Sequence, residues 1–256
     1  MVPIRTNLYS SIFWSVSRPK FPLSLGHFVI RLNDPALAFS TESAADLLHC
    51  YGSWRRAMTE LSGATAAQLY MAQNWQPVGD ALGEPLAETS TPTLHVFFNV
   101  PGSTTAAAAL RLPAHQRVAV EDTADLDEQL RLWRDSVAGE PALEAGLTDS
   151  PPSGPEPVFR LEAVNPATLN DGHWMAVPRT ASTTIDHIEA ESLVELAGAM
   201  DHVATQATPP IQGLTVWVTD QWESAVEFHL FARRHGDERQ HVANFVADGG
   251  LDVPEL

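Results

Sequence analysis

The chain has 256 residues, of which 44% are hydrophobic, so it can bury one large core or two of ordinary size. Its 32 acidic residues outnumber its 15 basic ones, and a net charge of −17 disfavours nucleic acid and anionic lipid as partners. The single cysteine excludes an internal disulfide and a cysteine-based zinc site, and the ten histidines lack metal-ligand spacing, so we expect no metal and no cofactor.

No apolar run is long enough for a membrane helix, and the first twenty residues lack the pattern of a signal peptide. These two observations predict a cytoplasmic protein.

The first hundred residues read as strands around one long helix. Apolar residues at helical spacing predict an amphipathic helix that begins at an N-cap, Ser40 or Thr41, and ends at Gly63. Arg55 is expected on its outward face. β-Branched and alternating stretches predict strands at residues 12–17, 27–32, 67–75 and 93–100.

The segment between the last two of these strands is the most unusual part of the chain. It is long, rich in Gly and Pro, and contains three acids, Asp80, Glu84 and Glu88. It leads directly into the strand TLHVFFNV, which has His95 at its middle. Long polar loops that lead into a core strand are commonly functional, so we expect a site here. A histidine on a strand can equally be a hydrogen-bonded core residue, and the loop alone does not decide between the two.

The middle of the chain is expected to contain less regular structure. Residues 101–113 read as a connection of small residues, and Asp122 can cap a second helix that buries Leu126, Leu130 and Trp133. The stretch 144–157, EAGLTDSPPSGPEP, has the composition of a linker.

After the linker the same elements recur in the same order. Strands are expected at 158–164, 171–179, 213–222 and 226–234, with a helix around residues 193–203. Gly172–His173 stand where Gly26–His27 stood, and His229 stands where His95 stood. This recurrence indicates a duplicated unit. We therefore expect an N-terminal half at 1–110, a helical segment and linker at 111–157, and a C-terminal half at 158–256.

The motifs FPLSLGHFVIRL and STPTLHVFF resemble those of the histidine-triad (HIT) superfamily, which includes galactose-1-phosphate uridylyltransferase and the diadenosine polyphosphate phosphorylases. The resemblance implies an α+β fold of two HIT-like halves, each an antiparallel sheet with a helix, related by a pseudo-twofold axis. Such a chain has the architecture of a HIT dimer, and both a monomer and a further homodimer remain open.

The resemblance also implies roles for residues. The nucleophile that attacks a phosphate falls on His95, and residues that hold the substrate fall on Ser90 and Asn74. Thr93 occupies the place of the first triad histidine and Phe97 that of the third, so a loop acid, Glu88 or Asp80, has to act as general acid if P–O cleavage persists. Trp75 can pack in the core or stack on a base or sugar.

Three functions therefore remain open. The first is a nucleotidyltransferase or phosphoester hydrolase that acts on a nucleotide or sugar-phosphate through His95. The second is acid–base catalysis on a small non-phosphorylated metabolite by Glu88, His95 or Asp80, and the third is a non-catalytic binding module. Because only the first half keeps the long acidic loop, an active protein should have one pocket beside His95, lined by Asn74, Trp75, Glu88 and Ser90, and a filled counterpart at His229.

Overall fold

The protein is described from a computed structural model, and the described residues are 7–73, 93–112, 116–120, 122–137, 158–164, 172–179, 184–206, 211 and 213–233. The strands are β1 (Asn7–Ser10), β2 (Trp14–Ser17), β3 (His27–Leu32), β4 (Ala67–Gln73), β5 (Thr93–Phe98), β6 (Phe159–Ala163), β7 (His173–Pro178), β8 (Gly213–Asp220) and β9 (Glu227–Arg233). The helices are α1 (Thr41–Ser62), α2 (Ala106–Arg111), α3 (Ala124–Val137), α5 (Ala190–Gln206) and the short 3₁₀ helix η2 (Ile185–His187).

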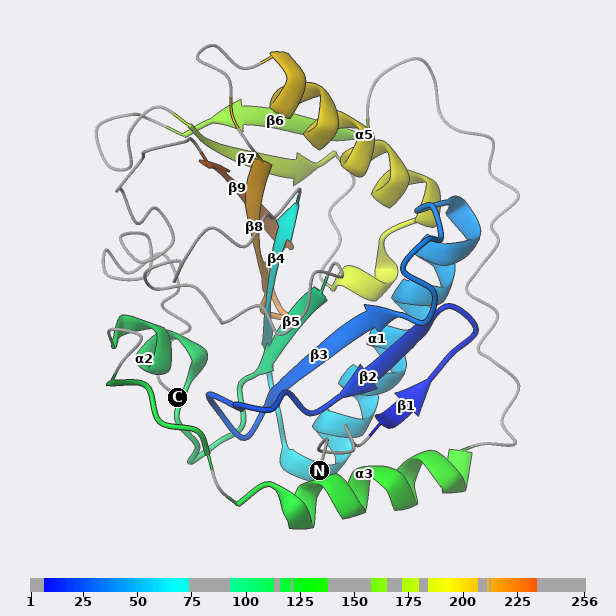
Figure 1. Ribbon diagram of the computed structural model, residues 1–256, viewed down its shortest axis with the longest axis vertical. Coiled ribbons are helices and arrows are strands. Elements are labelled where there is room, and N and C mark those ends of the chain that lie inside the picture. Colours follow the sequence, from blue (N-terminus) through cyan, green and yellow to red (C-terminus); the bar gives the residue numbers. More distant parts are fainter. Residues whose placement is uncertain are drawn as a thin grey trace.

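The described strands form one nine-stranded sheet in the order β1-β2-β3-β5-β4-β8-β9-β7-β6, and neighbouring strands among them are antiparallel (Figure 1). The two parts of the chain meet where β4 pairs with β8, in a register that sets Tyr70 opposite Trp217. The expected α+β class is thus confirmed, whereas the domain boundaries at 110 and 158 stay a prediction.

One face of the sheet packs against α1 and α5, and this side contains the larger hydrophobic core. Because side chains alternate between faces along a strand, Phe28, Val96 and Val216 point to this core while their neighbours point to the other face. A smaller core on that second face contains Tyr70, Phe97 and Trp217 together with Leu110 of α2 and others.

Helix α1 follows its sequence signals closely. The Ser40 side chain caps the first turn by accepting the Ser43 N–H, and Gly63 ends the helix at φ 66°. The expected outward position of Arg55 is wrong, because its guanidinium forms a half-buried ion pair with Asp186 of η2 at 2.7 Å. This contact ties α1 to the segment before α5.

Two other expectations need correction. Residues 101–113 are not merely a connection, since Thr105 caps the short helix α2, whose Leu110 is buried in the smaller core. The helix expected from a cap at Asp122 begins at Ala124 instead, after Thr123, whose carbonyl accepts the Asp127 N–H. The other predicted helices and strands are present with small shifts of their ends, and β1 was not predicted.

Candidate functional site

The second face of the sheet has two pairs of hydrogen-bonded histidines. On β3 and β5, His27 Nε2 lies 3.0 Å from His95 Nδ1. On β7 and β9, His173 Nε2 lies 3.1 Å from His229 Nδ1. His27 and His173 thus serve as hydrogen-bonding scaffolds for the central histidines of β5 and β9.

Matching strand registers place the two pairs in the same way. His27 is opposite Phe97 and Val29 is opposite His95, just as His173 is opposite Phe231 and Met175 is opposite His229. Each first histidine also stacks on the phenylalanine opposite it, with ring centroids 4.1 Å apart for His27 and Phe97 and 4.4 Å apart for His173 and Phe231. Phe97 and Phe231 therefore hold His27 and His173 in place.

The proton of His27 can be placed from its neighbours. Its Nδ1 accepts the backbone N–H of Leu23 at 3.1 Å, so in the neutral ring the proton is on Nε2. Burial, helped by the nearby His95 and Arg18, holds the pKa of His27 well below its usual value, which keeps the ring neutral. His27 Nε2–H consequently donates to His95 Nδ1, and a neutral His95 has its own proton on Nε2.

Gly26 and Arg18 hold the backbone around His27. A Cβ at Gly26 would lie 2.1 Å from the carbonyl oxygen of Phe98, so only glycine allows β5 to come this close. Arg18 Nη1 donates to the carbonyl oxygens of Leu25 at 2.6 Å and of His27 at 2.8 Å.

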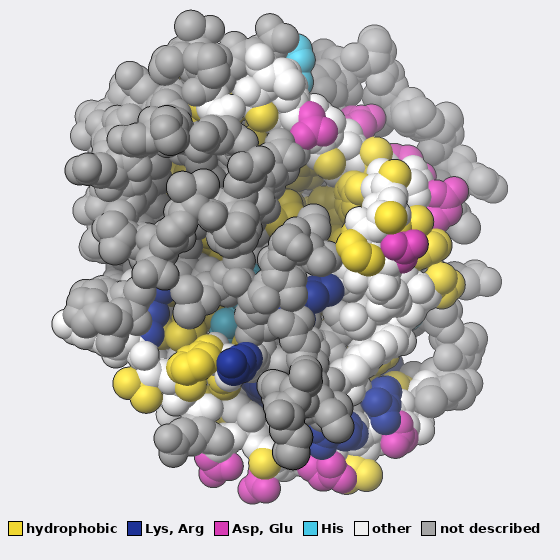
Figure 2. Space-filling view, viewed as in Figure 1, with side chains coloured by type: hydrophobic (Ala, Val, Ile, Leu, Met, Phe, Trp, Pro, Cys, Tyr) yellow, Lys and Arg dark blue, Asp and Glu magenta, His cyan; other side chains and the backbone are white. Residues whose placement is uncertain are grey.

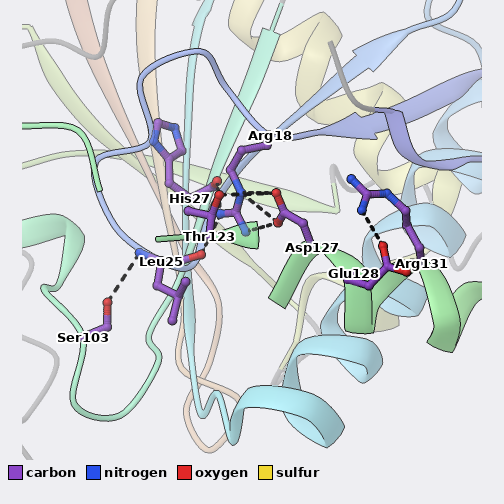
Figure 3. A network of polar contacts seen from close by, with 8 residues as sticks. All are labelled: Arg18, Leu25, His27, Ser103, Thr123, Asp127, Glu128 and Arg131. Carbon is purple, nitrogen blue, oxygen red and sulfur yellow. Dashed lines mark hydrogen bonds and ion pairs between the residues drawn. The ribbon is translucent and has the colours of Figure 1, made fainter. Parts of the chain in front are cut away.

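The other nitrogens of Arg18 bind α3. Its Nη2 forms an ion pair with Asp127 Oδ1 at 2.6 Å, and both side chains are about nine-tenths buried (Figure 3). Burial lowers the pKa of Arg18, and the hydrogen bond and charge of Asp127 oppose this effect. Helix α3 is thereby connected through one guanidinium to the backbone that carries His27.

Further polar and aromatic groups surround His95 on this face. Tyr70 of β4 contacts it edge-on, with ring centroids 6.0 Å apart. Arg31 of β3 donates from Nε to the Thr93 hydroxyl at 3.2 Å, two residue pairs along the strands from His95. His95 itself is only 3% exposed. In the space-filling view, a histidine side chain is visible in a hollow bordered by hydrophobic and basic side chains (Figure 2).

The second pair has a different neighbour. His229 Nε2 lies 3.5 Å from a carboxylate oxygen of Glu227, which occupies the place of Thr93 on the matching strand. Burial lowers the pKa of His229, and the negative charge of Glu227 opposes that shift. His229 is buried and bonded on both ring nitrogens, as expected for a supporting residue.

Of the predicted site residues, the structure describes His95 and Thr93, which are two positions apart on β5. Asn74, Trp75, Asp80, Glu88 and Ser90 lie outside the described residues, so their roles and the expected pocket remain predictions. Sequence reasoning missed Arg31 and Tyr70, since only strand pairing shows that they share the face of His95. Among the described residues, no three His, Cys, Asp or Glu side chains gather as metal ligands would, and no helix there is long and apolar enough to cross a membrane.

No family model and no curated protein matches the chain. Similar solved structures include an ADP-glucose phosphorylase from Arabidopsis thaliana with bound ADP-glucose, at 11% identity and a TM-score of 0.47 over 87% of this chain and 72% of that one. A DUF4931 family protein from Bacillus cereus matches at 9% identity and a TM-score of 0.48 over 98% and 92%. A uridylyltransferase matches at 10% identity and a TM-score of 0.41 over 86% and 73%.

At 9–11% identity the likeness is one of fold alone, so the function has to be inferred from this chain's own residues.

Proposed function

We propose that the protein is an enzyme that acts on a nucleotide or sugar-phosphate at the His95 face of the sheet, by nucleotidyl transfer or phosphoester hydrolysis. The observation that supports it best is the ordered pair of His27 and His95, in which one ring fixes the orientation and the tautomer of the other. A ring oriented through one nitrogen presents the other nitrogen in a defined direction, as nucleophilic and acid–base catalysis require.

In this proposal His95 Nε2 attacks phosphorus, and the P–O bond to the leaving group breaks. Because the neutral ring has its proton on Nε2, that proton has to shift to Nδ1 before the attack, with the His27–His95 hydrogen bond reversed and the proton of His27 on its own Nδ1. A protonated loop carboxyl, Glu88 or Asp80, is then proposed to donate the proton that the leaving-group oxygen takes up. Ser90, Asn74 and Trp75 are proposed to hold the substrate, and Thr93 to hold a phosphate oxygen.

We also propose that the two halves arose by duplication and are related by a pseudo-twofold axis that passes between Tyr70 and Trp217. The equal registers around His27–His95 and His173–His229 support this arrangement. It accounts for one chain with two histidine pairs, of which the first is the working one.

The second candidate function is acid–base catalysis on a small metabolite without phosphate. It is favoured by one observation: His27 leaves a neutral His95 with its proton on Nε2. In this tautomer His95 can act as a general acid without any rearrangement of its proton. Since His95 is only 3% exposed, both candidates require the groups around it to move before a substrate can touch Nε2.

Intact mass spectrometry at neutral pH separates the candidates. The protein is incubated with ADP-glucose or with a dinucleoside polyphosphate, and a nucleotidyl adduct is expected on the wild type but not on His95→Ala. His229→Ala, the matched variant in the other half, should still form the adduct. Turnover of these compounds without an adduct would show that His95 is not the nucleophile, whereas turnover of a metabolite without phosphate that is lost in His95→Ala would favour the second candidate. Neither adduct nor turnover, with stabilisation by nucleotides in a thermal-shift assay, would leave a binding module.

A further inference from the structure

The two histidine pairs are surrounded by side chains of opposite charge. On β3 and β5, the paired residues two positions beyond Val29 and His95 are Arg31 and Thr93. On β7 and β9, the residues two positions beyond Met175 and His229 are Val177 and Glu227. The first pair therefore has a cation and a hydroxyl at the positions where the second pair has an aliphatic residue and a carboxylate.

Arg31 is held on the face of His95 by contacts with two neighbouring strands. Its Nε donates to Thr93 Oγ1 at 3.2 Å, and its Nη1 lies 3.5 Å from Ser17 Oγ on β2. The arginine and the threonine are both half-buried. A guanidinium fixed by neighbouring strands keeps the planar geometry that binds two oxygens of a phosphate at once.

Glu227 has the opposite effect on the second pair. Its carboxylate lies 3.5 Å from His229 Nε2, the nitrogen that corresponds to the one proposed to react in His95. A phosphate that approached His229 would meet this negative charge at close range and would have to break the contact. Val177 is aliphatic, and Arg160, which is opposite it on β6, forms an ion pair with Glu162.

The overall charge makes this local difference matter. At a net charge of −17, an anion approaching the protein is repelled over most of its surface, and only a local cation can reverse this. From these observations we propose that Arg31, with Thr93, selects phosphoryl anions for the first histidine pair, and that Glu227 excludes them from the second. This inference names the anion-binding residues of the site assumed under the proposed function and rests on that function.

Isothermal titration of the whole chain with pyrophosphate and with ADP-glucose tests the selection. One anion per chain is expected to bind the wild type, and Arg31→Val, which introduces the residue of the other half, should weaken binding at least tenfold. Arg31→Lys should lie in between, because it keeps the charge but not the fork. Val177→Leu is the matched control and should bind as the wild type does. Melting temperatures show whether each variant is folded, and Arg31→Gln replaces Arg31→Val if that variant is not.

The reverse exchange tests the exclusion. The double variant Val177→Arg/Glu227→Thr gives the second pair the residues of the first, and a second bound anion per chain is expected. Equal binding by the wild type and Arg31→Val, two anions on the wild type, or none would each overturn the proposal.

Activity distinguishes this inference from the proposed function. If Arg31 variants lose pyrophosphate binding while the wild type forms no adduct and turns nothing over, the proposed reaction fails and the anion selection stands. If the wild type is active and Arg31→Val keeps the same KM and kcat, the anion selection fails and the reaction stands.

Discussion

Asp220, at the end of β8, should make the stability of the protein depend on pH. Its side chain has no exposed surface and lies between β8, α1 and η2. The Tyr51 hydroxyl of α1 donates to Oδ2 at 2.5 Å, and the backbone N–H of Ile185 donates to the same oxygen at 3.4 Å. Oδ1 has no hydrogen-bond partner among the described residues. The charged groups that face it are Asp186 of η2 and Arg55 of α1.

Burial is the main reason that the pKa of Asp220 rises from 3.8 to about 6, and the charge of Asp186 adds to the rise. The hydrogen bonds from Tyr51 and Ile185 and the charge of Arg55 oppose it. The folded state therefore binds this proton more tightly than the unfolded state. The stabilisation that Asp220 contributes is fully present at pH values below 3.8. It decreases as the pH rises from 3.8 to about 6, and above that pH it has been lost. At about 1.4 kcal/mol per pKa unit, the loss amounts to roughly 3 kcal/mol.

Asp220→Asn removes the ionisation and keeps an oxygen that can accept the Tyr51 hydroxyl. Urea unfolding at intervals from pH 4 to pH 8 gives the unfolding free energy of the variant minus that of the wild type. This difference should rise by roughly 3 kcal/mol over the pH range, because only the wild type loses the stabilisation. Glu223→Gln, an exposed acid three positions away, is the control and should show no such shift. A difference curve for Asp220→Asn that stays flat within about 0.5 kcal/mol would refute the reasoning, because Asp220 would then titrate alike in both states.

Three further outcomes are expected, two from residues that support His27 and one from a comparison glycine on α5. Gly26→Ala should lower the unfolding free energy by about 2 kcal/mol or more, since its Cβ would clash with the Phe98 carbonyl oxygen. Gly198→Ala on α5, where a Cβ meets nothing within 4 Å, should instead stabilise by roughly 0.5–1 kcal/mol, and urea midpoints of the two variants compare them directly. Arg18→Met leaves the buried Asp127 without its ion-pair partner and should cost about 3–5 kcal/mol, whereas the double variant Arg18→Met/Asp127→Leu should regain most of this loss. Double-mutant denaturation curves check that recovery, and a double variant no more stable than Arg18→Met would contradict it.

Much of the fold could be read from local patterns in the sequence. Ser40 and Gly63 mark the ends of α1 because a cap and a left-handed glycine act within one turn of the helix. The alternation in TLHVFF likewise assigns His95 to one face and Val96 to the other before any partner strand is known. The recurrence of Gly–His and of a later strand with a central histidine indicated a duplicated unit, and the structure has two histidine pairs on corresponding strands.

Tertiary structure alone decided which side chains meet. The pairing of β4 with β8, which sets Tyr70 opposite Trp217, depends on a register between strands more than a hundred residues apart, and no local pattern encodes it. The contact of Arg31 with Thr93 follows from the same kind of register. Arg55 was misplaced for this reason also: helical periodicity places it on the outer side of α1 but does not reveal that η2 brings Asp186 against that side. Periodicity fixes the face of a side chain, and only packing fixes its neighbours, on which charge, tautomer and pKa depend.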